Sequence, residues 1–232
     1  MKENKSITQQ GNRVRRNILK DAEAKTIGYL CTILPKWIKP DHLTALGIVG
    51  GVIVAIGLYL AVSNPYYLLL SILGFAVHWF GDSLDGRIAY YRNTPRKWYG
   101  WALDINADWV SICIIGLGFY MYFPNYKVVA FLFVIAYGGS MIVALLRYKI
   151  TNEYQIDSMN IGPTELRIII SIFLLLEILV AGSLWYFAIV GSVILMLANF
   201  IDSIQILAAG DERDHIERKA KLKKNENRYA YP

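Results

Sequence analysis

The sequence predicts an all-α, polytopic membrane protein with six transmembrane helices and an N-terminal amphipathic helix in the membrane interface. Three observations lead to this prediction. Hydrophobic residues make up 55% of the 232 residues and charged residues only 18%, which is more apolar than a soluble domain of this size. The apolar residues form long blocks instead of amphipathic stripes. Finally, basic residues are distributed unequally among the segments that connect the blocks.

Six apolar blocks are near or above the ~20 residues that a helix needs to cross the hydrocarbon core. They cover residues 43–63, 66–91, 98–123, 128–147, 163–181 and 185–207. We therefore expect one six-helix domain over residues 43–210. A cytoplasmic or interfacial segment, 1–42, precedes this domain, and a charged cytoplasmic tail, 211–232, follows it.

The basic residues test this helix count, because six spans assign alternate connections to opposite sides of the membrane. Of the 24 Lys and Arg residues, all but Lys127 fall on one side. The positive-inside rule makes this side cytoplasmic and places both termini there. The net charge of +6 then follows from topology and from attraction to anionic membrane lipid, and we expect no nucleic-acid partner.

Residues 13–34 mix apolar and basic side chains in a pattern that is typical of a helix lying in the membrane interface. An ordinary solvated helix is the alternative. Pro35 ends the pattern, and Trp37 is placed to anchor the chain at the interface. Cys31 and Cys113 lack metal-ligand spacing and are interpreted as small apolar residues.

Four aspartates lie within the second and third apolar blocks. Asp82 and Asp85 are three residues apart and Asp104 and Asp108 are four apart, so each pair shares one face of its helix. At ~1.5 Å per residue, each pair lies ~9–15 Å from the cytoplasmic end of its helix. Since the short loop 92–97 joins the two helices into a hairpin, the pairs are expected to face each other.

Carboxylates at this depth need cations, because an Asp at mid-membrane costs about 2.5–3.5 kcal/mol even on an insertion scale. Oxygen ligands suit Mg²⁺ or Mn²⁺. Four carboxylates are enough to bridge two ions about 3.5–4 Å apart, an arrangement that clamps a phosphoryl group. Gly81, Gly86 and Gly100 allow a ligand or a backbone to approach closely, although simple helix packing is the alternative.

These residues resemble the signature of the CDP-alcohol phosphotransferase (CDP-alcohol phosphatidyltransferase) family. The matching elements are Asp82-x-x-Asp85-Gly86-x-x-Ala89, Gly100-x-x-x-Asp104-x-x-x-Asp108 and the lead-in Pro40-Asp41-His42-Leu43-Thr44. The resemblance covers about residues 20–205. Two positions depart from the family pattern: Tyr90 stands where Arg is usual, and Asp41 where Asn is usual.

The resemblance implies metal-dependent transfer of a substituted phosphate group from a CDP-linked alcohol to an acceptor hydroxyl, with release of CMP, in phospholipid biosynthesis. The CDP group carries either diacylglycerol or a head group, so at least one substrate is a lipid. A homodimer in the cytoplasmic membrane and two Mg²⁺ or Mn²⁺ ions are also implied. The resemblance assigns the metal ligands to Asp82, Asp85, Asp104 and Asp108, and makes Asp108 the general base as well.

The resemblance further implies a nucleotide site and a region for the acceptor. The nucleotide site comprises Asp82, Asp85, Gly86 and Ala89, with Thr44 and Asp41 beside them. Candidates for binding an acceptor or a phosphate are Arg87, Arg92, Arg147, Lys149 and Arg167. These cations also fit the pattern of residues that snorkel to the membrane surface.

Two other functions remain as alternatives. Intramembrane acidic residues mark ion pathways, so the chain is alternatively a transporter or an ion-binding protein; however, the sequence lacks the repeated halves typical of transporters. A membrane prenyltransferase also binds diphosphate through Asp-rich motifs, but its motifs lie on distant helices of a larger bundle.

Overall fold

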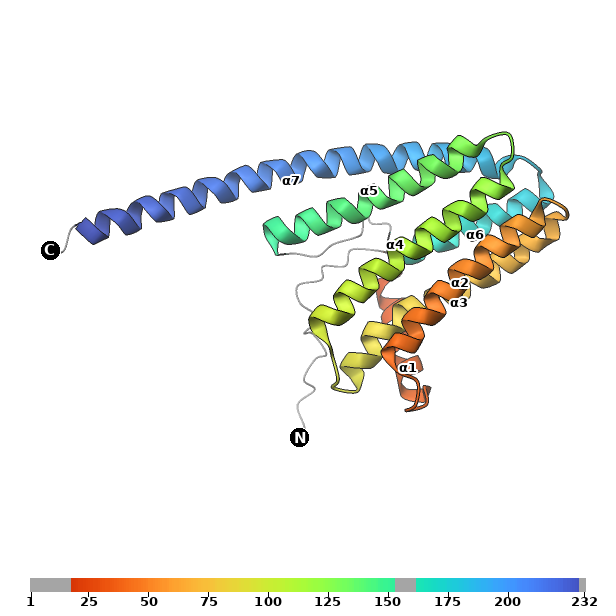
Figure 1. Ribbon diagram of the computed structural model, residues 1–232, viewed down its shortest axis with the longest axis horizontal. Coiled ribbons are helices and arrows are strands. Elements are labelled where there is room, and N and C mark those ends of the chain that lie inside the picture. Colours follow the sequence, from red (N-terminus) through yellow and green to blue (C-terminus); the bar gives the residue numbers. More distant parts are fainter. Residues whose placement is uncertain (1–17, 153–161, 230–232) are drawn as a thin grey trace.

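The structure, a computed structural model, describes residues 18–152 and 162–229. Within these ranges the chain is helical and has no strand, which confirms the all-α prediction. The elements are α1 (Lys20–Ile33), α2 (Pro40–Ala61), the short 3₁₀ helix η1 (Pro65–Tyr67), α3 (Leu68–Tyr91), α4 (Lys97–Tyr122), α5 (Lys127–Thr151), α6 (Pro163–Leu179) and α7 (Ser183–Tyr229). Helices α2 to α6 lie side by side with the first part of α7, while α1 lies at one end of this bundle (Figure 1).

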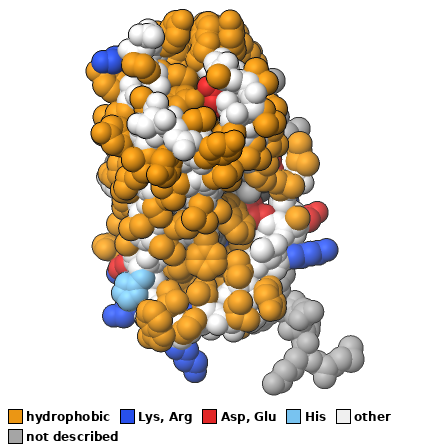
Figure 2. Space-filling view, turned by 90° about the vertical axis from the view of Figure 1, so that its right-hand side faces the viewer, with side chains coloured by type: hydrophobic (Ala, Val, Ile, Leu, Met, Phe, Trp, Pro, Cys, Tyr) orange, Lys and Arg blue, Asp and Glu red, His pale blue; other side chains and the backbone are white. Residues whose placement is uncertain are grey.

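Five stretches of the described chain are long and apolar enough to cross a membrane: α2, η1 with α3, α4, α5 and the greater part of α7. The sixth predicted span corresponds to α6, which has 17 residues. The count of six therefore stays a prediction. Apolar side chains cover much of the molecular face in Figure 2, as expected for a surface in contact with lipid.

Helices α2 and α3 pack so closely that their backbones touch. A methyl group on Gly50 would collide with the backbone of His78, and one on Gly81 would collide with the backbone of Gly47. Only glycine permits this approach. The contact places the segment of α3 that begins at Asp82 directly against the start of α2.

The larger apolar cluster lies in the half of the bundle away from the aspartates. It joins the second half of α2 to the first half of α3 and the second half of α4, through buried residues such as Val54, Phe75 and Phe119. Because this half is well packed, it holds the helices in a fixed register. The aspartates lie at the other end of the same helices.

Helix α1 packs on that other end of the bundle. Its buried residues are Glu23, Ile27 and Cys31, and the last two join an apolar cluster with residues of α2 and α3. Burial raises the pKa of the Cys31 thiol, which fits its interpretation as an apolar contact. Residues 13–17 of the predicted interfacial helix lie outside the described part of the chain, and the interfacial position of α1 stays a prediction.

The last helix differs from the prediction in length. The predicted span 185–207 and the charged tail after it form one continuous helix, α7, of 47 residues. Figure 1 shows α7 running along α5 and then projecting beyond the bundle. Arg213 donates hydrogen bonds to the carbonyls of Lys149 and Ile150 at 3.1 and 2.7 Å, which ties the first turn of the projecting part to the end of α5.

Candidate active site

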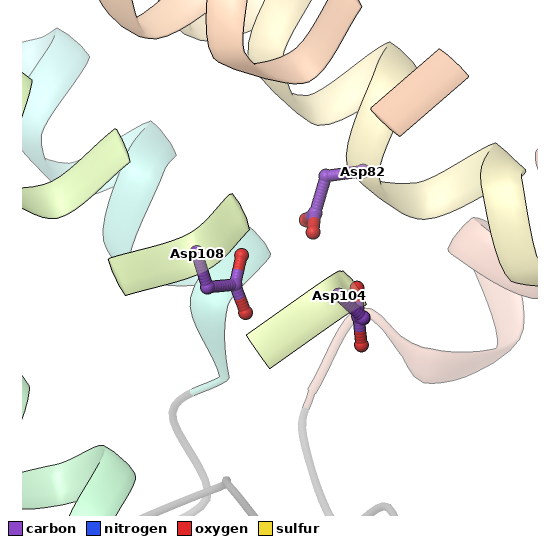
Figure 3. Close-up of side chains that lie close together, drawn as sticks. All are labelled: Asp82, Asp104 and Asp108. Carbon is purple, nitrogen blue, oxygen red and sulfur yellow. The ribbon is translucent and has the colours of Figure 1, made fainter. Parts of the chain in front are cut away.

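Three of the four predicted metal ligands converge. One carboxylate oxygen from each of Asp82, Asp104 and Asp108 lies within 4.8 Å of the other two. Figure 3 shows the Asp82 side chain on α3 pointing toward the side chains of Asp104 and Asp108 on α4. Helices α3 and α4 make few direct contacts with each other. Both pack on α2, and this shared contact brings the two predicted faces together.

Asp85 lies beside this group, and its contacts are of a different kind. It is buried, with 8% of its surface exposed, and its Oδ2 accepts a hydrogen bond of 2.6 Å from the hydroxyl of Thr44. A charge-assisted bond of this kind compensates for the burial of the carboxylate. The bond also fixes α3 to the start of α2, so Thr44 orients the second aspartate of the α3 pair.

A cavity of about 210 Å³ opens over the aspartates. All four aspartates line it. The remaining predicted site residues that line it are Asp41, Thr44, Gly86, Arg87, Ala89 and Arg167. The cavity therefore unites the predicted metal and nucleotide residues in one space, to which α2, α3, α4 and α6 all contribute.

Arg167 on α6 reaches into the aspartate group. Its Nη2 donates to Oδ2 of Asp82 at 2.6 Å, and the two side chains are 13% and 20% exposed. The guanidinium neutralises part of the negative charge that the aspartates concentrate here. Thus Arg167, which the sequence proposed only as an acceptor or phosphate candidate, contacts a predicted metal ligand.

Three other predicted cations do not line the cavity. Arg92 caps the turn at 34–38, where it donates to the carbonyls of Leu34 and Pro35 at 3.1 and 2.9 Å and to that of Ile38. Arg147 forms an ion pair of 2.8 Å with Asp202, which joins α5 to α7. Lys149 is exposed near the end of α5. Arg92 and Arg147 each contact a segment that is distant in the sequence. The sequence alone therefore could not show that these two side chains have a structural role instead of a role in the cavity.

Sequence reasoning missed some residues of the cavity wall. Glu23 of α1 lines the cavity although it is far from the motif in sequence, and Trp101 and Tyr148 line it as well. Trp101 and Tyr148 are in contact, with ring centroids 5.8 Å apart. One feature of the sequence could have indicated Glu23. It shares a helical face with the apolar residues Ile27 and Cys31, four and eight residues further on, and a carboxylate on an apolar face is typical of a functional or paired group.

The donor set fits a divalent cation. Carboxylate oxygens are the ligands that Mg²⁺ and Mn²⁺ prefer, and the three oxygens of the Asp82, Asp104 and Asp108 group lie close enough together for one ion to contact them all. The guanidinium of Arg167 shares Asp82, so a cation and this arginine would compete for the same oxygen or divide the two oxygens between them.

Fold and site together define an all-helical membrane protein with a carboxylate-lined cavity at one end of its bundle. Residues 37–202 match the family model of the CDP-alcohol phosphatidyltransferases, so the chain belongs to this family. Its membership confirms the family suggested by the sequence motif. A comparison with curated proteins gives no match.

Membership makes the chain a transferase of the kind that acts in phospholipid synthesis. Together with the five apolar helices, it identifies an integral membrane protein. The matched range includes all four aspartates and leaves out α1. The family match no longer favours a transporter or a prenyltransferase, because the acidic residues that suggested these alternatives lie within the matched range.

Proposed function

We propose that this chain transfers a substituted phosphate group from a CDP-linked alcohol to the hydroxyl of an acceptor alcohol, with release of CMP. At least one of the two substrates is a lipid, since the cavity belongs to a membrane-embedded bundle. The observation that carries the proposal is the convergence of Asp82, Asp104 and Asp108 from two helices on a cavity within a chain of this family.

Asp82, Asp85, Asp104 and Asp108 hold two Mg²⁺ or Mn²⁺ ions in this proposal. When bound, the cations neutralise the diphosphate of the donor and the charge that develops as the phosphorus–oxygen bond to CMP breaks. The chain itself orients the ligands: Thr44 holds Asp85 at 2.6 Å, and Arg167 holds Asp82 at 2.6 Å.

Asp108 is the general base of the proposed reaction. It belongs to the aspartate group and lines the cavity, so an acceptor hydroxyl bound there can come within the ~2.6–3.2 Å that proton transfer needs. Asp108 takes the proton of that hydroxyl as the acceptor oxygen bonds to phosphorus. The electron pair of the broken bond leaves with CMP.

The nucleotide binds along the wall formed by α2 and α3. Asp41, Thr44, Gly86 and Ala89 line this wall. Asp41 forms an ion pair with Arg96, which also lines the cavity. This pair brings a guanidinium to the cavity mouth, next to the space for a negatively charged nucleotide.

We further propose that the protein acts as a homodimer. A measurement of its molecular mass in detergent tests this proposal.

Release of CMP tests the proposed function directly. The purified chain, supplied with Mg²⁺ or Mn²⁺, a panel of CDP-linked donors and a panel of alcohols, should release CMP, and a chelator should stop the release. Asp108→Asn should lower turnover by about 10²–10⁴-fold, the usual contribution of general base catalysis. Its melting temperature should stay close to that of the parent, because the side chain keeps its size.

Asp211→Asn is the matched control for this substitution. Asp211 is an exposed residue of the projecting part of α7, so its variant should release CMP at the parental rate. Absence of CMP with every donor and acceptor would refute the transferase function. Full activity of the Asp108→Asn variant would remove only the assignment of the base.

A further inference from the structure

His78 is a buried polar side chain on the face of α3 that carries the aspartates. It lies four residues before Asp82, so the two side chains are neighbours on this face. Only 5% of its surface is exposed, and its Nδ1 has no hydrogen-bond partner among the described residues. A polar nitrogen buried without a partner is unfavourable, so a small polar ligand beside the ring would stabilise it.

A second, much smaller cavity lies next to His78. Its volume is about 10 Å³, and its polar wall consists of Thr44, His78, Ser111 and all four aspartates. A site for one buried water needs a volume of about 10–15 Å³ and two to four polar partners. The cavity therefore has the size and the chemistry to hold a single water molecule.

The aspartates lie between this cavity and the larger one. In α3, His78 comes before Asp82, whereas the residues of α3 that line only the larger cavity come after it. In α4, Ser111 follows Asp108 by three residues, which is ~4.5 Å further along the helix. The small cavity is thus about one helical turn closer to the well-packed half of the bundle, behind the carboxylates.

Helix α2 fixes the two backbones that form this deeper wall. A methyl group on Gly50 would collide with the backbone of His78, and one on Gly51 would lie 3.6 Å from Cβ of Ser111. His78 and Ser111 are therefore both held against the glycines of α2. The polar wall is preformed, because close helix packing and not a bound ligand defines it.

His78 lies too far from the aspartate group to share a metal ion with it directly. Two ligands of one Mg²⁺ ion are at most about 4 Å apart, since each lies about 2.0–2.1 Å from the ion. Among the described residues, the group whose ligand atoms lie within 4.8 Å of one another contains Asp82, Asp104 and Asp108 and excludes His78. A hydrogen-bonded water spans such a gap.

We infer that His78 positions the metal-binding aspartates through one water bound in the small cavity. Its Nδ1–H donates to the water oxygen, and the two water hydrogens are donated to the carboxylates of Asp82 and Asp108, the deeper aspartate of each pair. This inference rests on the proposed metal site. Groups that orient metal ligands in this way typically contribute about 10–100-fold to metal affinity, so His78 is a positioning residue.

Binding of Mn²⁺ to the full chain in detergent, without an affinity tag, tests the inference. Electron paramagnetic resonance measures free Mn²⁺ and gives the Kd without reference to turnover. His78→Leu removes the ring nitrogen and should raise this Kd about 10–100-fold. His78→Asn places an amide N–H close to the position of Nδ1 and should keep the Kd within about threefold of the parental value.

Ser71→Ala is the matched control for a loosened contact between α2 and α3. Ser71 is fully buried in the same helix and its hydroxyl donates to the carbonyl of Val54 at 3.0 Å, but it lines neither cavity. Its variant should have a lower melting temperature and the parental Kd for Mn²⁺. The melting temperature of metal-free His78→Leu should stay close to that of the parent, because leucine leaves no unpaired nitrogen.

A parental Kd in His78→Leu would overturn the inference, as would an equal loss of Mn²⁺ affinity in Ser71→Ala. A His78→Asn variant as weak as His78→Leu would also refute the role of Nδ1. Pulsed resonance of the parent with Mn²⁺ should lack the nitrogen coupling of a directly bound imidazole; its presence would make His78 a ligand and exclude the water. If the parent bound no Mn²⁺, the proposed metal site would fail first, and the inference with it.

Discussion

At the scale of single residues, Gly86 forms a part of the cavity wall that has no side chain. A Cβ atom at this position would meet nothing within 4 Å, and the residue lines the cavity next to Asp85. A side chain here would therefore begin in open space and extend into the cavity, where we propose that the nucleotide binds. Glycine in the interior of a helix also lowers stability by about 1 kcal/mol relative to alanine.

Gly86→Leu should therefore separate activity from stability. We expect the KM of the CDP-linked donor to rise roughly 10–100-fold, because the leucine overlaps the bound nucleotide by an amount that typically costs about 1–3 kcal/mol. The melting temperature should stay equal or increase. CMP-release kinetics and thermal unfolding of the same preparation provide the two measurements.

Gly28→Leu is the control for this substitution, since Gly28 on α1 also has open space around its Cβ position and does not line the cavity. The Gly28→Leu variant should keep the parental KM for the CDP-linked donor. A normal donor KM in Gly86→Leu would show that the nucleotide binds elsewhere in the cavity.

The sequence could predict those site residues whose relative positions depend on spacing within one helix or across one short loop. The spacing of Asp104 and Asp108 fixes one face of α4, and the short loop 92–97 returns the chain beside α3. The packing of both helices on α2 then turns this face toward Asp82. Contacts between distant elements could not be predicted in this way. Arg167 is separated from Asp82 by 85 residues, and only the packing of α6 against α3 makes them neighbours.

At the scale of elements, Glu177 joins α6 to α7. It is 6% exposed. Its carboxylate accepts hydrogen bonds from the backbone N–H groups of Gly182 and Leu184 at 2.8 and 2.6 Å. It also accepts from the Tyr122 hydroxyl at 2.9 Å. The negative charge lies at the N-terminus of α7, where the helix dipole and the unpaired N–H groups favour it.

Glu177→Ala should destabilise the fold, because it leaves buried N–H groups at the start of α7 without an acceptor. We expect a loss of about 2–4 kcal/mol, measured by thermal unfolding in detergent through intrinsic fluorescence. Tyr122→Phe removes only one of the bonds and should cost about 1 kcal/mol.

Glu212→Ala, at an exposed position of α7, serves as the reference for the Glu177 variants and should leave the melting temperature unchanged. If the Glu177→Ala and Glu212→Ala variants had the same melting temperature, the Glu177 carboxylate would have no structural role at this connection. The position of Glu177 in the sequence does not identify these contacts, since its partners belong to a turn whose conformation depends on Gly182, with a φ of 88°.

At the scale of the whole molecule, the number of membrane crossings depends on α6. Its 17 residues have a length of ~26 Å at ~1.5 Å per residue, a few ångströms less than the ~30 Å hydrocarbon core. A mismatch of this size costs only fractions of a kcal/mol per ångström. Since α6 lies alongside the long helices of the bundle (Figure 1), we propose that it crosses the membrane with them.

Reporter fusions decide between six crossings and five. With six, reporters at the two termini should both be active as cytoplasmic fusions, and one inserted between Pro124 and Asn125 should be active only on the opposite side. This outcome agrees with the charge distribution, in which Lys127 alone among the basic residues lies at the far end. Termini on opposite sides would mean that α6 does not cross. The long charged end of α7 would then lie across the membrane from the N-terminus, contrary to the positive-inside rule, so a cytoplasmic C-terminal reporter is the expected result.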